Sequence, residues 1–145
     1  MKKMLLFALL TMVFLFTGCK QRIEQAPEEV LNAFAAMFPN ATHVEWSRQI
    51  STFAADFYHD QHDKQVQFDS TGTWLQTKTE VSIYEVPVPV MAATRKFSNR
   101  KVDDVYLFEQ PNGAEAYYKV KYKPETPFST KQIHILTDGT ILSAL

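Results

Sequence analysis

Apolar and polar residues alternate along several segments of the chain, and this period of two predicts β-strands with one buried side. In 65–69, Val66 and Phe68 fall on one face and Gln65 and Gln67 on the other. Segment 116–123 alternates as strictly, with two tyrosines and a valine on one face and a tyrosine and three lysines on the other. Further strands, rich in β-branched and aromatic residues, are predicted over 42–46, 52–58, 73–83, 133–135 and 141–145.

Two other segments have apolar residues at helical spacing. The first follows Pro27, which suits a first helical turn, and Glu28 and Glu29, whose charges favour the positive end of a helix dipole. The second spans 90–97 and follows a Val-Pro-Val-Pro segment. The apolar positions of the first helix are Val30, Leu31, Phe34, Ala35, Met37 and Phe38, after which Pro39 ends it.

One strand–turn–strand pattern occurs twice, with the second copy 67 positions after the first. Each copy contains a glycine that lets the chain reverse at positive φ, Gly72 in the first and Gly139 in the second. We therefore predict an α+β domain of two tandem helix-plus-antiparallel-strand repeats, over 27–85 and 86–145. The recurring residues are Val66, Phe68, Gly72, Thr73 and Leu75, followed by Ile133, Ile135, Gly139, Thr140 and Leu142.

The first residues have the pattern of an export signal. Lys2 and Lys3 precede an uncharged apolar run over 5–16, which is shorter than the roughly twenty residues of a spanning helix. The following tetrad, Phe16-Thr17-Gly18-Cys19, resembles the lipobox of bacterial lipoproteins. We interpret 1–18 as a lipoprotein signal peptide, Cys19 as the lipidation site and 19–26 as a tether, which predicts a membrane-anchored periplasmic or cell-surface protein. An ordinary cleaved signal with a chance cysteine is the alternative.

Charge is distributed unevenly over the exported part. It carries 16 acidic and 13 basic residues, and no cysteine other than Cys19, so disulfides cannot stabilise the domain. Segment 27–85 has nine acidic and three basic residues, whereas 86–145 has six acidic and eight basic residues. The absence of a strong positive field argues against nucleic-acid binding.

Three phrases together resemble the PepSY-like, β-lactamase-inhibitor-like (BLIP-like) proteins. The resemblance implies one curved antiparallel sheet with helices on one face and the other face open, in a small exported protein that binds or inhibits another protein. The chain departs from the β-lactamase inhibitors themselves in having no disulfides, and no inhibitory loop is assigned to it. The phrases are Phe68-Asp69-Ser70-Thr71-Gly72-Thr73-Trp74-Leu75, Pro87-Val88-Pro89-Val90-Met91-Ala92-Ala93 and Thr137-Asp138-Gly139-Thr140-Ile141-Leu142.

The polar residues give little support for catalysis or metal binding. The chain has no nucleophile elbow, phosphate-binding glycine loop or zinc-protease helix motif, so we predict that it is not an enzyme and needs no cofactor. His59, Asp60, His62 and Asp63 could bind zinc or copper, which makes a metal-binding or sensory module the alternative function. A solvated hairpin tip also explains this cluster.

The outward face of the predicted sheet is the better candidate site. Aromatic residues there would offer large contact areas to an envelope protein or peptide, with lysines around them. His43 and His134 are read as separate surface residues. The predicted binding residues are Trp74, Tyr58, Tyr106, Tyr117, Lys119 and Lys121.

Overall fold

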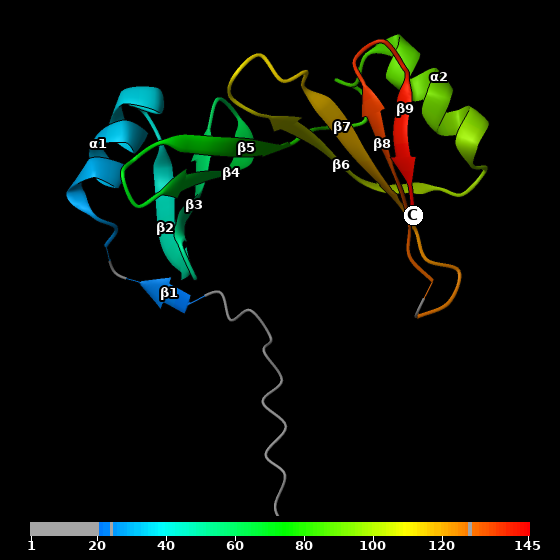
Figure 1. Cartoon of the computed structure of the whole chain (residues 1–145). Coiled ribbons are helices and arrows are strands. Elements are labelled where there is room, and N and C mark those ends of the chain that lie inside the picture. Colours follow the sequence, from blue (N-terminus) through cyan, green and yellow to red (C-terminus); the bar gives the residue numbers. More distant parts are fainter. Residues whose placement is uncertain (1–20, 24, 128) are drawn as a thin grey trace, which may run out of the picture.

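The computed structural model describes residues 21–23, 25–127 and 129–145 (Figure 1). The predicted signal peptide and the lipidation site, Cys19, lie outside the described residues. Among the described residues, no helix has the length and apolar character needed to cross a bilayer. The elements are β1 (Gln21–Ile23), α1 (Glu28–Met37), β2 (Thr42–Gln49), β3 (Thr52–His59), β4 (His62–Asp69), β5 (Trp74–Glu80), α2 (Val88–Phe97), β6 (Val102–Glu109), β7 (Tyr117–Tyr122), β8 (Lys131–Leu136) and β9 (Ile141–Ala144).

The described strands form one antiparallel sheet whose spatial order is the order of the chain, from β1 to β9. Val66 pairs with Thr77, and Thr79 pairs with Leu107, so the buried side of β4 continues through β5 into β6. Both helices pack on this side, which leaves the opposite side open (Figure 1). The predicted α+β class and the two helices are confirmed.

The first core lies between α1 and strands β2 to β4. Val30 and Phe34 of α1 are buried there against Val66 and Phe68 of β4. The ring centroids of Phe34 and Phe57 are 5.0 Å apart at an interplanar angle of 90°, which is the edge-to-face arrangement that aromatic pairs favour. The helical pattern of α1 and the alternating pattern of the strands thus place their apolar side chains in one common core.

The second core lies between α2 and strands β6 to β8. Val90 of α2 packs with Val105, Ile133 and Ile135, all of which are buried. The Tyr122 hydroxyl donates a hydrogen bond of 2.8 Å to the carbonyl oxygen of Thr94 in α2, which satisfies two buried polar groups at once. The strict alternation predicted for segment 116–123 is confirmed in β7, because Tyr118, Val120 and Tyr122 all face this core.

The predicted tether over 19–26 is wrong for its described part. Gln21–Ile23 forms β1, which pairs with β2 at Arg22 opposite Ser47 and Ile23 opposite Trp46. Ile23 packs against the first core, and Ala26 is buried in it. The few apolar residues in this polar segment are sufficient to hold it against the sheet edge, because the unpaired backbone groups of β2 are available to it.

Trp74 was predicted to face outward, and this prediction is wrong. The pairing of β4 with β5 shifts register between Gln67 and Phe68, so that Phe68 lies opposite Trp74 while Gln67 lies opposite Gln76. This irregularity leaves one extra residue, Leu75, on β5. The Trp74 side chain therefore lies on the same side of the sheet as Phe68 and packs against the first core. The indole Nε1 donates a hydrogen bond of 3.0 Å to Thr77 Oγ1.

The two glycine turns lie against the beginnings of the two helices. Gly72 has φ +82° and Gly139 has φ +94°, as the sequence predicts for tight reversals. A Cβ on Gly72 would lie 2.5 Å from the carbonyl oxygen of Glu29, and one on Gly139 would lie 2.8 Å from that of Pro89. Each turn therefore needs glycine for both its backbone angle and its close contact with a helix.

Candidate functional site

The open side of β5 to β8 carries aromatic and lysine side chains in adjacent positions. Lys78, Phe108 and Tyr117 form one row across the paired strands, and Tyr106 and Lys119 lie side by side in the next row. These residues alternate with the buried positions of the same strands, and none is fully buried. We call the following set the lysine–aromatic surface: Lys78, Tyr106, Phe108, Tyr117, Lys119, Lys121 and His134.

Three rings form a continuous strip on this surface. Phe108 and Tyr117 are stacked, with ring centroids 5.1 Å apart and an interplanar angle of 3°. Tyr117 in turn contacts His134, with centroids 5.2 Å apart. Because each ring supports its neighbour across paired strands, the strip presents a rigid, partly apolar area that loses little conformational entropy on binding.

The lysines surround Tyr106. The Nζ atoms of Lys78 and Lys121 lie 5.3 and 4.9 Å from its ring centroid. Burial raises the pKa of Tyr106 to about 12, with added contributions from Asp104 and Glu80, so its hydroxyl remains protonated at neutral pH. None of the three lysines of this surface forms an ion pair with another described residue.

Lys119 and His134 share an environment that disfavours positive charge. Burial lowers the pKa of Lys119, and the neighbouring Lys121 and Lys78 lower it further. Burial and the charge of Lys119 also lower the pKa of His134. The His134 Nε2 atom is buried and forms no hydrogen bond with another described residue, and the ring packs against Tyr117, so His134 does not stand apart from the other rings of this surface.

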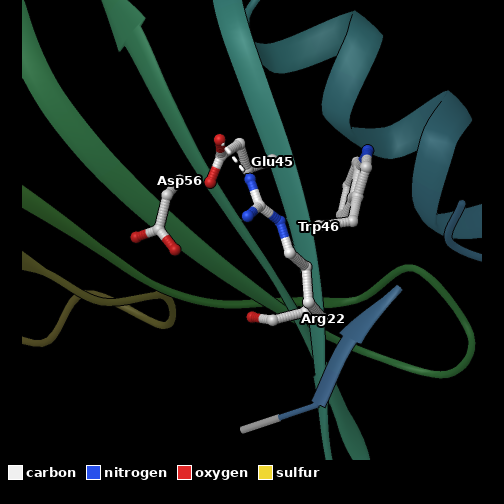
Figure 2. A pocket seen from close by; sticks show the side chains of 5 residues that line it. Arg22, Glu45, Trp46 and Asp56 are labelled. Atoms are coloured by element: carbon white, nitrogen blue, oxygen red, sulfur yellow. Dashed lines mark ion pairs between the residues drawn. The ribbon is translucent and has the colours of Figure 1, made fainter. Parts of the chain in front are cut away.

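The open side of β1 to β5 is acidic. Figure 2 shows the Arg22 side chain beside Glu45, with which it forms an ion pair, and the Asp56 carboxylate facing the same space. The Trp46 side chain points away from it toward α1. The hollow measures about 190 Å³. Arg22 and Glu45 are largely exposed, so their pairing contributes little stability, and the hollow is shallow and polar.

A second hollow of about 190 Å³ links the acidic and basic parts of the open side. Asp56 borders both hollows, and it accepts a hydrogen bond of 2.6 Å from Gln65 Nε2. The charged residues that line the second hollow are Asp63 and Lys64 on β4 and Lys78 and Glu80 on β5, and Tyr106 of β6 completes this lining. The hollow therefore carries both charges at the border of the lysine–aromatic surface.

The structure brings together four of the six predicted binding residues. Tyr106, Tyr117, Lys119 and Lys121 belong to one surface. Tyr58 is 41 % exposed on β3, and the strands that carry Asp63 and Glu80 separate it from Tyr106; Trp74 belongs to the first core. Sequence reasoning missed Lys78, Phe108 and His134. For Phe108 a signal was present, because it alternates with Tyr106.

The histidine–aspartate segment forms a tight turn between β3 and β4. Asp60 and Gln61 have φ 51° and 64°, as in a two-residue reversal. The His59 ring packs edge-on to Phe38; its Nδ1 lies 2.9 Å from an Asp60 carboxylate oxygen without forming a hydrogen bond. His62 Nε2 lies 3.2 Å from Glu85, in the segment that leads to α2. Within the described ranges, no group of three His, Cys, Asp or Glu residues is arranged to hold a metal ion.

Solved structures with the same architecture were found. No family model and no curated protein sequence matches the chain. A BLIP-like protein from Bacteroides fragilis is 27% identical, with 85% of this chain and 87% of that chain covered and a TM-score of 0.76. The chain has a BLIP-like fold.

Two further proteins share this BLIP-like fold. A DUF2874 family protein from Bacteroides uniformis is 28% identical, over 83% of this chain and 89% of that one, with a TM-score of 0.77. A protein from Bacteroides eggerthii that is inferred to be periplasmic is 25% identical, over 83% of this chain and 88% of that one, also with a TM-score of 0.77. These likenesses extend over most of the chain, and that to the Bacteroides eggerthii protein agrees with a periplasmic location.

Proposed function

We propose that this protein is a non-enzymatic, exported lipoprotein that binds an envelope protein or peptide through the lysine–aromatic surface. The observation that carries the proposal is the strip formed by Phe108, Tyr117 and His134 on the side of the sheet opposite both described helices. Stacked aromatic rings with a charged border are typical of the centres of protein interfaces. The likeness to a BLIP-like protein also supports a protein-binding role.

We further propose that the fold arose from two repeats, as the recurring turn pattern predicts. One helix followed by four strands, α1 with β2 to β5, is succeeded by α2 with β6 to β9. Gly72 and Gly139 contact the first turns of their respective helices in the same manner. This correspondence supports a boundary near position 85, with the lysine–aromatic surface mainly in the second repeat.

Partner capture tests the proposed function. The bait is the chain from Lys20 onward, because all described strands and both cores lie within it. We expect an envelope extract to yield one protein near one-to-one with this bait. The double change Phe108→Thr and Tyr117→Thr should weaken the affinity several hundredfold and so nearly abolish recovery of the partner, since interface anchors each contribute roughly 2 kcal/mol.

The control is Tyr58→Thr, which removes an exposed tyrosine on the same side of the sheet but outside the lysine–aromatic surface. It should retain the partner. Thermal unfolding followed by circular dichroism establishes that all baits are folded. Equal recovery by the parent and the double variant would contradict binding through this surface.

The lipid anchor has its own test. Incorporation of labelled palmitate should be lost when Cys19 is replaced by alanine, because no other cysteine is present in the chain. The protein should then leave the membrane fraction. Palmitate incorporation into Cys19→Ala would show that the acyl chain is attached elsewhere.

A further inference from the structure

We propose that the partner presents an extended acidic segment to the lysine–aromatic surface, with an aromatic residue and two carboxylates at alternate positions. This inference rests on the proposed function and specifies the chemistry of the partner. It follows from the unpaired lysines, from the spacing of side chains along β7, and from the acidic residues that limit the basic area.

Three lysines gather on this surface, and one carboxylate, that of Asp104, occupies the position cross-strand from Lys121. Lys78 and Lys121 both lie near the Tyr106 ring, and Lys119 occupies the adjacent cross-strand position. No ion pair joins these three lysines to another described residue. Partial burial, and after it repulsion by the charges of Lys121 and Lys78, lower the pKa of Lys119. A carboxylate placed among them would relieve this repulsion, and its own attraction would increase as water is excluded.

The spacing of side chains along β7 matches that of a peptide in extended conformation. Tyr117, Lys119 and Lys121 point to the same side at every second position, so neighbouring side chains are about 6.8 Å apart. A peptide in extended conformation has the same period. An aromatic residue facing the strip at Tyr117 would therefore bring carboxylates two and four positions away opposite Lys119 and Lys121.

The surrounding acids argue against a broad polyanion or an anionic membrane. Asp104 lies opposite Lys121, and Glu80 lies opposite Tyr106. Beyond β5, Asp63 lines the neighbouring hollow together with Lys64. An extensive anionic surface would bring many negative charges against all of these carboxylates, whereas a short segment brings only two, of which one, opposite Lys121, comes near Asp104.

A peptide titration observed by nuclear magnetic resonance tests the inference. The probe is acetyl-Gly-Phe-Gly-Asp-Gly-Asp-Gly-amide, and its matched control has asparagine in place of aspartate. With the ¹⁵N-labelled chain from Lys20 onward, we expect saturable shifts confined to amides of β5 to β8. The asparagine peptide should bind about tenfold more weakly, because two exposed charge pairs each contribute a modest amount.

Charge-matched variants locate the effect. Lys119→Gln with Lys121→Gln should weaken binding of the aspartate peptide about tenfold. Lys96→Gln with Lys101→Gln removes the same charge from exposed positions outside the surface and should leave the affinity unchanged. Raising the salt concentration should weaken the aspartate peptide more than the asparagine peptide.

Any of the following results would contradict the recognition of an acidic segment. Equal affinity for both peptides, or no saturable shift with either, would show that carboxylates are not recognised. Sedimentation with phosphatidylglycerol vesicles that depends on Lys119 and Lys121 would assign the surface to a membrane. A dimer, seen by analytical ultracentrifugation and abolished by the same two changes, would assign it to a second copy. The proposed function fails separately, if capture is insensitive to Phe108→Thr and Tyr117→Thr.

Discussion

Replacing Phe68 with alanine is expected to lower the free energy of unfolding by about 3 to 5 kcal/mol. The Phe68 side chain is fully buried, and its cross-strand neighbours are Phe53 on β3 and Trp74 on β5. Removing the ring loses its burial and leaves a cavity, because strands on both sides hold the surrounding side chains in place. Among the single substitutions considered, this one removes the most buried apolar volume.

Urea unfolding with two probes measures this effect. Both tryptophans, Trp46 and Trp74, pack in or against the first core, so their fluorescence reports that half, whereas circular dichroism reports the whole sheet. The matched control is Phe108→Ala on the open side, which should cost less than half as much because Phe108 is only partly buried. Equal losses from the two substitutions would contradict the assignment of Phe68 to a closed core.

Replacing Gly72 with alanine is expected to destabilise the protein by about 2 to 4 kcal/mol, through two effects. An alanine at φ +82° pays roughly 1 to 2 kcal/mol for the left-handed conformation. Its Cβ would also lie 2.5 Å from the carbonyl oxygen of Glu29, a backbone atom that cannot rotate away. The beginning of α1 must therefore shift, which disturbs the packing of Val30 in the first core.

Gly113 provides a control that separates the two effects. Its φ is +70°, but a Cβ there would meet no atom within 4 Å. Gly113→Ala should therefore cost only the conformational term, about 1 to 2 kcal/mol. The difference between the two variants in thermal or urea unfolding measures the helix contact. If Gly72→Ala costs no more than Gly113→Ala, the turn and α1 are not in tight contact.

The reliable predictions came from regular periodicity. Strict alternation placed Tyr118 and Tyr122 inward and Tyr117 and Lys119 outward, because a strand without a bulge has only two faces. The same reasoning failed at Trp74, where one inserted residue reverses the face. A bulge of this kind depends on the neighbouring strand and leaves no sign in the period of its own strand.

The candidate surface could be predicted only in part, because it crosses several strands. Tyr117, Lys119 and Lys121 lie on one strand, and their common face follows from alternation. Lys78 joins them only through the pairing of β5 with β6, which places it opposite Phe108, thirty positions later in the chain. The position of His134 beside Tyr117 likewise depends on the register between β7 and β8. Registers over such separations are set by tertiary packing.

The pairing of β1 has a consequence for where the surface operates in the cell envelope. If Cys19 is acylated as proposed, it is two residues away from Gln21, where the described sheet begins, and two residues span at most about 7 Å. The β1 edge would then rest at the membrane. Because the strands follow in chain order at about 4.8 Å each, β7 would lie roughly 25 to 30 Å farther along the sheet. The sheet itself would act as a spacer, setting the height above the lipid headgroups at which a partner is met.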